Sequence, residues 1–272
     1  MELPPPVPVP QLTVQDLRDL CYAKSLLENP GLTARMANLL GSPIEKGFKL
    51  LPKGWSETVH KATKAALVKA LELAVATLGA KNRKKASERF HKMLVGASGG
   101  IGGAFGLAAL PIELPFSTTI MLRSIADIAR SEGHNIGAVQ TRLSCLEVFA
   151  LGGTSAADDA AESSYWAVRA ALAKAVSEAA TYIAERGVLE KTAPAVVRLI
   201  AAIASRFGIV VSEQVAAKAI PLVGAASGTI INVLFINHFQ DMARGHFIVK
   251  RLEARYGSAM VKSVYDTLAI PM

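Results

Sequence analysis

Apolar residues recur at helical spacing along most of the chain. Between residues 164 and 186, one face of the expected helix carries Tyr165, Val168, Leu172, Val176, Ala179 and Ile183. This spacing is typical of an amphipathic helix that packs against a core. The longest β-branched run, Ile209-Val210-Val211, is too short to indicate a strand. The pattern therefore predicts an all-α fold, a multi-helix bundle.

Capping and stop signals divide the chain into helices. Thr13 and Asp16 can cap a helix that runs to about Asn29, where Pro30-Gly31 stops it. By the same signals we expect further helices over about 43–51, 56–78, 116–132, 139–151, 164–186, 194–207, 244–256 and 258–268. Residues 1–11 are rich in proline and predict an extended tail. Residues 12–272 are expected to form a single helical domain.

Two uncharged apolar segments, 93–112 and 219–237, stand out from these amphipathic stretches. The first is long enough, at 1.5 Å per residue, to cross a hydrocarbon core of about 30 Å. Both contain glycines four residues apart, a spacing that lets a second helix backbone approach closely. The glycines expected to pack in this way are Gly96, Gly99, Gly100, Gly103, Gly106, Gly224 and Gly228. We expect the two segments to pack together as central helices or as a hairpin.

A cluster of basic residues precedes the first apolar segment and suggests contact with anionic lipid on the cytoplasmic side of a membrane. Its members are Lys81, Arg83, Lys84, Lys85, Arg89 and Lys92. Two full spans would place 113–218 across the membrane, although that region reads as ordinary amphipathic helices and the N-terminus lacks the pattern of an export signal. Peripheral or re-entrant contact is therefore favoured over an integral or a freely soluble protein.

Several polar residues interrupt positions where apolar residues are expected. They are Glu113, Arg123, Asp127, Asn232, Asn237, Asp241 and Arg244. Because burying a charge is costly unless it is paired, these residues are expected to meet one another or a ligand. One interpretation is a set of internal salt bridges, such as Arg123 with Asp127 at the i,i+4 spacing. The others are binding of a polar head group and proton chemistry.

A short echo relates the two halves of the chain. Asp127-Ile128-Ala129-Arg130 and Asp241-Met242-Ala243-Arg244 share the pattern Asp-x-Ala-Arg. An internal duplication would make the two halves pseudo-symmetric, and chance similarity between alanine-rich helices is the alternative.

Composition and motifs limit the other classes of function. Lysine and arginine exceed aspartate and glutamate by eight, which favours an acidic partner, while the low aromatic content of 6% gives no support for nucleic-acid binding. Cys21 and Cys145 are expected to be buried free thiols. No catalytic motif, metal cluster or nucleotide-binding loop is recognisable, so no catalytic residue, metal ligand or cofactor is expected.

Two ordered blocks of residues resemble a known family. The first comprises Gly99-Gly100-Ile101-Gly102-Gly103, Gly106-Leu107, 110–115 and 121–126, and the second comprises 218–225, Asn232, Ala243, Phe247, Arg251-Leu252-Glu253 and Tyr256-Gly257. Over about 90–257 the chain resembles the EcsC family of bacterial proteins. That family is named for a protein encoded beside ABC transporter subunits and has no established biochemical activity. The resemblance implies action near a membrane, with transporter subunits as candidate partners, and assigns no catalytic residue.

These observations favour a non-enzymatic, membrane-associated helical protein that assists transport, secretion or envelope maintenance. Two alternatives remain open. One is a hydrolase of lipid or peptide that uses Glu113, Asp127 or Asp241 as acid or base. The other is a soluble carrier of an apolar ligand held between the two apolar segments. The oligomeric state is not predicted.

Overall fold

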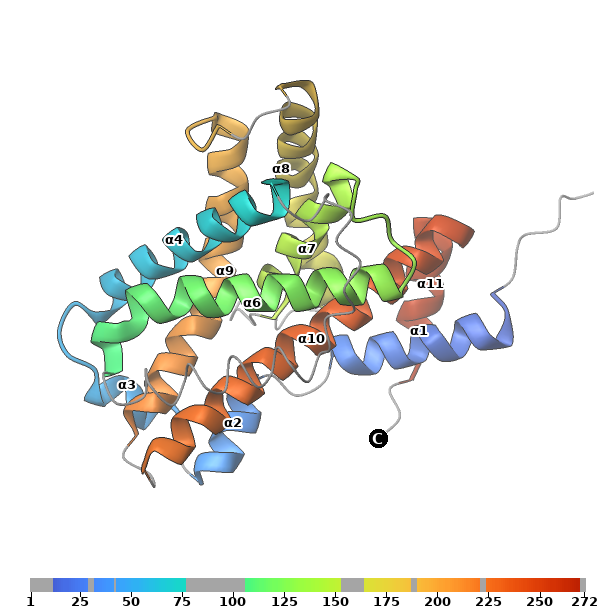
Figure 1. The fold of residues 1–272 in the computed structure, drawn as a ribbon. Coiled ribbons are helices and arrows are strands. Elements are labelled where there is room, and N and C mark those ends of the chain that lie inside the picture. The colour runs from blue at the N-terminus through green and yellow to red at the C-terminus, as the bar shows by residue number, and fades with distance from the viewer. Residues whose placement is uncertain are drawn as a thin grey trace, which may run out of the picture.

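The structure is a computed structural model, and it describes residues 12–28, 32–41, 43–76, 106–152, 164–186, 190–220 and 224–269. All regular elements in these ranges are helices, which confirms the all-α fold (Figure 1). Their bounds are α1 Val14–Leu27, α2 Leu32–Leu40, α3 Glu45–Leu50, α4 Trp55–Ala76, the 3-10 helix η1 Gly106–Ala109, α6 Leu110–Ser131, α7 Val139–Leu151, α8 Ser164–Arg186, α9 Pro194–Ala219, α10 Gly224–Tyr256 and α11 Ser258–Thr267.

The helices form a bundle in which α4, α6 and α10 lie roughly along one direction and α9 crosses them (Figure 1). Helix α4 packs against both α6 and α9, and α1 packs along α10. Helix α8 stands beside the first part of α9, and together they project from the rest of the molecule (Figure 1). Helix α7 joins this projecting pair to the main body, because it contacts α6 and α10 as well as α8 and α9.

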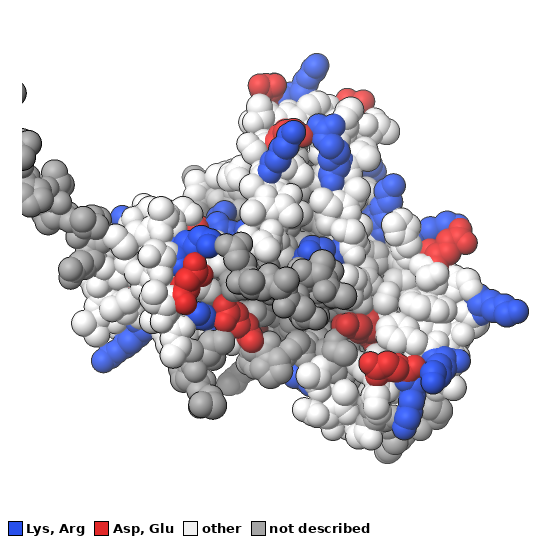
Figure 2. Space-filling view, turned by 180° about the vertical axis from the view of Figure 1, so that it is seen from behind, with Lys and Arg blue, Asp and Glu red and all other residues white. Residues whose placement is uncertain are grey.

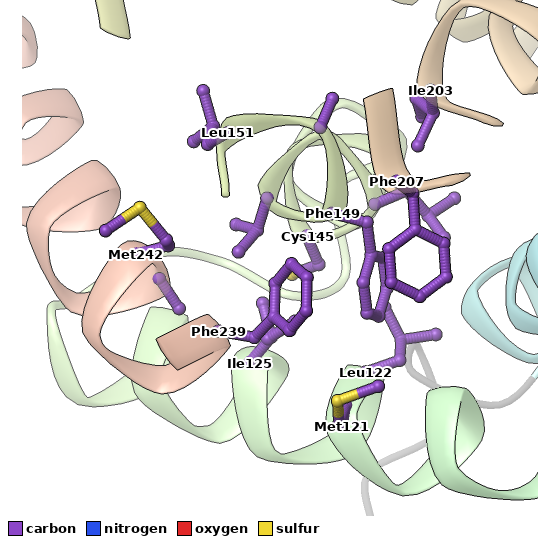
Figure 3. Packing of buried hydrophobic residues seen from close by; sticks show 14 of the residues in the cluster. Met121, Leu122, Ile125, Cys145, Phe149, Leu151, Ile203, Phe207, Phe239 and Met242 are labelled. Carbon is purple, nitrogen blue, oxygen red and sulfur yellow. The ribbon is translucent and has the colours of Figure 1, made fainter. Parts of the chain in front are cut away.

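Phenylalanine rings from three helices form the centre of the core. Phe149 of α7, Phe207 of α9 and Phe239 of α10 are fully buried, and their ring centroids lie 5.0–5.5 Å apart (Figure 3). Met121, Leu122 and Ile125 of α6 line the same core. Each buried ring contributes about 1.5–3 kcal/mol by leaving water, and tilted or edge-on pairs add to this. The core thus fixes α6, α7, α9 and α10 relative to one another.

Most predicted helix bounds agree with the structure, and the departures have local causes. Thr13 caps α1 as expected, with its hydroxyl accepting from the Asp16 amide. Helix α6 begins earlier than predicted, since Pro111 fits its first turn, where no intrahelical N–H bond is lost. Helix α2 was not predicted, and α9 continues past Phe207 to Ala219.

Helix α10 is a single helix of 33 residues, and the prediction that a new helix begins near Arg244 is wrong. Polar residues between 232 and 244 looked like an interruption in the apolar pattern. In the folded protein several of them find partners on other helices, so the helix continues through them. Gly245 lies against α1, where a Cβ atom would come within 2.6 Å of Leu27. The absence of a side chain therefore allows α1 and α10 to approach closely.

The two apolar segments are described only in part. Residues 93–105 of the first segment, with four of its packing glycines, lie outside the described residues, as does the basic cluster between Lys81 and Lys92. The rest of the first segment forms η1, which begins at Gly106, and the start of α6. The second segment lies mainly in α10, which begins at Gly224 and buries Gly228. Helices α6 and α10 pack against each other.

Candidate functional site

A network of four polar residues joins the ends of three helices. The Glu113 carboxylate of α6 accepts hydrogen bonds from Lys218 Nζ of α9 at 2.7 Å and from Asn232 Nδ2 of α10 at 3.1 Å. Gln214 Nε2 of α9 donates to Asn232 Oδ1 at 2.8 Å. The side chains of Glu113 and Lys218 are only 10% and 15% exposed. This arrangement satisfies a charge pair that is largely removed from water.

Helix ends favour the position of each charge in this network. Glu113 lies in the first turn of α6, where exposed N–H groups favour a negative charge, and Lys218 lies in the last turn of α9, where carbonyl groups favour a positive one. Glu113 belongs to the first block of the family resemblance, and Lys218 and Asn232 belong to the second. The two blocks therefore meet in space at this network.

Exposed apolar side chains surround the network. They come from the start of α6, from α3 and from the start of α10, and are Ile112 at 80% exposure, Phe116 at 52%, Leu50 at 55% and Ile230 at 44%. We call this region, formed by α3, the start of α6, the C-terminus of α9 and the start of α10, the apolar end. It lies at the left of Figure 1. The described parts of both apolar segments lead to it.

Exposed lysines border the apolar end on helix α3 and just after it. Lys46, Lys49 and Lys53 are all exposed. Basic side chains protrude around this end of the molecule, which lies at the right of Figure 2. Helix α3 is held tightly, because Gly47 packs directly on the backbone carbonyl of Ala216 in α9. That carbonyl occupies the space that a Cβ atom at position 47 would need. The lysines thus project from a helix whose position is fixed.

The remaining predicted polar residues lie elsewhere. Asp127 forms a salt bridge with Arg130 at 2.6 Å. Arg123, the partner that the i,i+4 spacing predicted for Asp127, is exposed. Asp241 pairs with Arg35 of α2 at 3.3 Å. Asn237 and Arg244 are half-buried on α10, and Asn237 Oδ1 has no hydrogen-bond partner within the described parts of the chain. Glu113 and Asn232 therefore meet directly, as predicted for members of this set, whereas Asp127 and Asp241 pair with Arg130 and Arg35, which are not among the seven candidates.

Sequence reasoning missed a second buried polar group. Glu147 of α7 and His246 of α10 lie in the interior with Oε2 and Nε2 3.6 Å apart, and Tyr165 of α8 contacts His246 Nδ1 at 3.2 Å. Burial raises the pKa of Glu147 and lowers the pKa of His246 well below its usual value, because both charged forms are poorly solvated. A signal was present, since Glu147 is a lone charge within the apolar run 143–151.

Metal and membrane-spanning features are limited in the part of the chain that the structure describes. Its His, Cys, Asp and Glu side chains form no group of three or more that could hold a metal ion. One described helix, α9, is long and apolar enough to cross a membrane, with a mean hydropathy of 1.8 over its most apolar window. Helix α9 also packs against α3, α4, α7, α8 and α10, as the core helix of a bundle does.

Most of the chain matches a known protein family. The model of the EcsC protein family matches residues 16–252. This match starts within α1 and so includes the N-terminal helices, which lie before the region that carried the resemblance. No curated protein and no solved structure matches the chain. Because the family match spans most of its length, the chain belongs to the EcsC protein family.

Proposed function

We propose that this protein attaches peripherally to an anionic membrane surface through its apolar end and acts there without catalysis, in support of transport, secretion or envelope maintenance. The observation that carries the proposal is the coincidence of exposed apolar side chains with exposed lysines at that end. Ile112, Phe116 and Leu50 would enter the lipid interface, while Lys46 and Lys49 would contact anionic head groups.

The chemistry of α3 and its surroundings suits an interface between water and lipid. Phe48 and Trp55 lie on either side of the turn that joins α3 to α4, with ring centroids 5.4 Å apart. Tryptophan and lysine are enriched where a protein meets the head-group layer. The basic cluster between Lys81 and Lys92 lies outside the described residues, and it would add further attraction to the same anionic surface.

The hydrolase alternative has less support from the geometry of its carboxylates. Glu113 is engaged by Lys218, Asp127 by Arg130 and Asp241 by Arg35. Pairing of this kind suits residues that hold helices in register. For this reason we favour binding over catalysis.

Co-sedimentation with lipid vesicles tests the proposal. A lysine near an anionic surface contributes about 1 kcal/mol to binding. Lys46→Gln with Lys49→Gln should therefore weaken partitioning onto vesicles that contain phosphatidylglycerol by about thirtyfold. Ile112→Ser with Phe116→Ser should weaken it further, because each substitution removes apolar area from the lipid interface.

The matched control changes the same amount of charge elsewhere. Lys174→Gln with Arg186→Gln alters two exposed basic residues of α8, in the projecting pair of helices. This variant should bind vesicles nearly as well as the wild type. Equal loss of binding in both double variants would indicate a general charge effect, and wild-type protein that ignores anionic vesicles would refute the proposal.

A further inference from the structure

A pocket of about 380 Å³ lies between α7, α8, α10 and α11, at a distance from the apolar end. Its volume is at the small end of the range of about 300–1,000 Å³ typical of small-molecule sites. Part of its wall is apolar and part is charged. The lining residues are Gln140, Glu147, Trp166, Arg169, Ala170, Ala173, Val176, Lys250, Ser258 and Lys262.

The charged part of the wall is predominantly basic. Arg169, Lys250 and Lys262 come from three different helices, and Glu147 is the only carboxylate among the described lining residues. Lys262 is also close to Asp266 on its own helix, at 3.2 Å. Lys250 has no ion pair with any residue that the structure describes, so its charge is available to a ligand.

Arg169 is fixed before any ligand arrives. Its guanidinium donates two hydrogen bonds to the Glu253 carboxylate, at 3.0 and 2.8 Å, and lies 5.0 Å from the centre of the Trp166 ring. Trp166 is 7% exposed, and its Nε1 atom is buried with no hydrogen-bond partner among the residues that the structure describes. A rigid cation costs little to order when an anion binds.

Glu147 lines the pocket and belongs to the buried polar group that includes Tyr165 and His246. Arg169 can only donate, so its 3.3 Å contact makes Tyr165 the acceptor and leaves the tyrosine hydroxyl to donate to His246 Nδ1. His246 then carries its hydrogen on Nε2, which faces Glu147. Burial raises the pKa of Glu147, although the charges of Lys250 and Arg169 oppose this shift.

We propose that this pocket binds a small molecule or lipid head group bearing a phosphate or carboxylate. Lys250 contacts its anionic oxygens, and the fixed positive charge of Arg169 lies in the same wall. The apolar part of the ligand lies against Ala170, Ala173 and Val176 of α8. The proposal is independent of the membrane surface described above, because none of these residues belongs to the apolar end.

Calorimetric titration of the full chain tests this assignment. The probes are inorganic phosphate, glycerol phosphate, hexanoate and phosphatidylglycerol vesicles, so that free anions and lipid head groups are separated. At least one probe should bind saturably. Lys250→Gln should weaken that binding about tenfold or more, as expected for the loss of a charge-assisted contact. Lys250→Arg should restore most of it.

Two further variants distinguish a ligand contact from a folding defect. Ala173→Trp adds bulk at the exposed rim and should block binding while the circular dichroism spectrum stays unchanged. Lys174→Gln, on the neighbouring outward position, should bind as the wild type does. Absence of saturable binding by every probe, or equal binding by wild type, Lys250→Gln and Ala173→Trp, would overturn the proposal.

Discussion

Replacing Glu113 with glutamine removes the charge that balances Lys218. Breaking a buried pair costs about 3–5 kcal/mol, whereas breaking an exposed pair costs 1 kcal/mol or less. With exposures of 10% and 15%, this pair lies near the buried limit. Glutamine can still accept the hydrogen bond from Asn232, which retains part of the network. We therefore expect Glu113→Gln to lower the free energy of unfolding by about 2–3 kcal/mol.

A double-mutant cycle measures how much of this loss comes from the pair itself. Lys218→Met removes the ammonium group that Glu113→Gln leaves without a counter-charge. The double variant should therefore be less destabilised than the sum of the single variants, by about 1–3 kcal/mol. Urea unfolding followed by circular dichroism gives the three values.

An exposed ion pair provides the control for this cycle. Glu57 and Lys61 form a pair on α4 with exposures of 70% and 74%. Glu57→Gln should leave the unfolding midpoint unchanged. Additive effects of Glu113→Gln and Lys218→Met, or a loss from Glu113→Gln no greater than that from Glu57→Gln, would refute the reasoning that this pair joins α6 to α9.

Two further predictions concern the packing of helices and the response to acid. Gly245→Leu should lower the unfolding midpoint in urea, because its side chain would collide with Leu27. Gly208→Ala should raise stability by up to about 1 kcal/mol, because no described atom lies within 4 Å of the added methyl group. His238 is buried and its pKa falls from 6.5 to about 4, so the unfolded chain binds the proton more tightly. Stability should decline as the pH falls from 6.5 towards 4, and His238 alone should account for about 3 kcal/mol of that decline. His238→Gln should flatten that part of the profile of stability against pH.

Local signals predicted the fold well where they act within a helix. The bounds of α7 and α8 agree with the sequence prediction because Gly152 and Gly187 follow their last residues. Thr13 was recognised as the cap of α1 for a similar reason. Such signals depend only on neighbouring residues, so they can be read without knowledge of the tertiary structure.

Partners that are distant along the chain account for the main errors. Asp241 looked like an interruption of α10, but Arg35, which lies more than two hundred residues away, pairs with it. Glu113 was singled out as a charge that needs a partner, but its partner Lys218 could not be identified from spacing. The polar group around Glu147 was missed because its members, Glu147, Tyr165 and His246, lie on three different helices, and spacing along the chain does not show that they meet.

Fractionation of cells that produce the protein tests membrane attachment most directly. The protein should sediment with the membranes and leave them on washing with high salt or with carbonate, because the lysines and exposed apolar side chains of the apolar end form a peripheral contact. Lys46→Gln with Lys49→Gln should shift the protein towards the soluble fraction. Protein that remains wholly soluble, or that only detergent releases, would contradict the account.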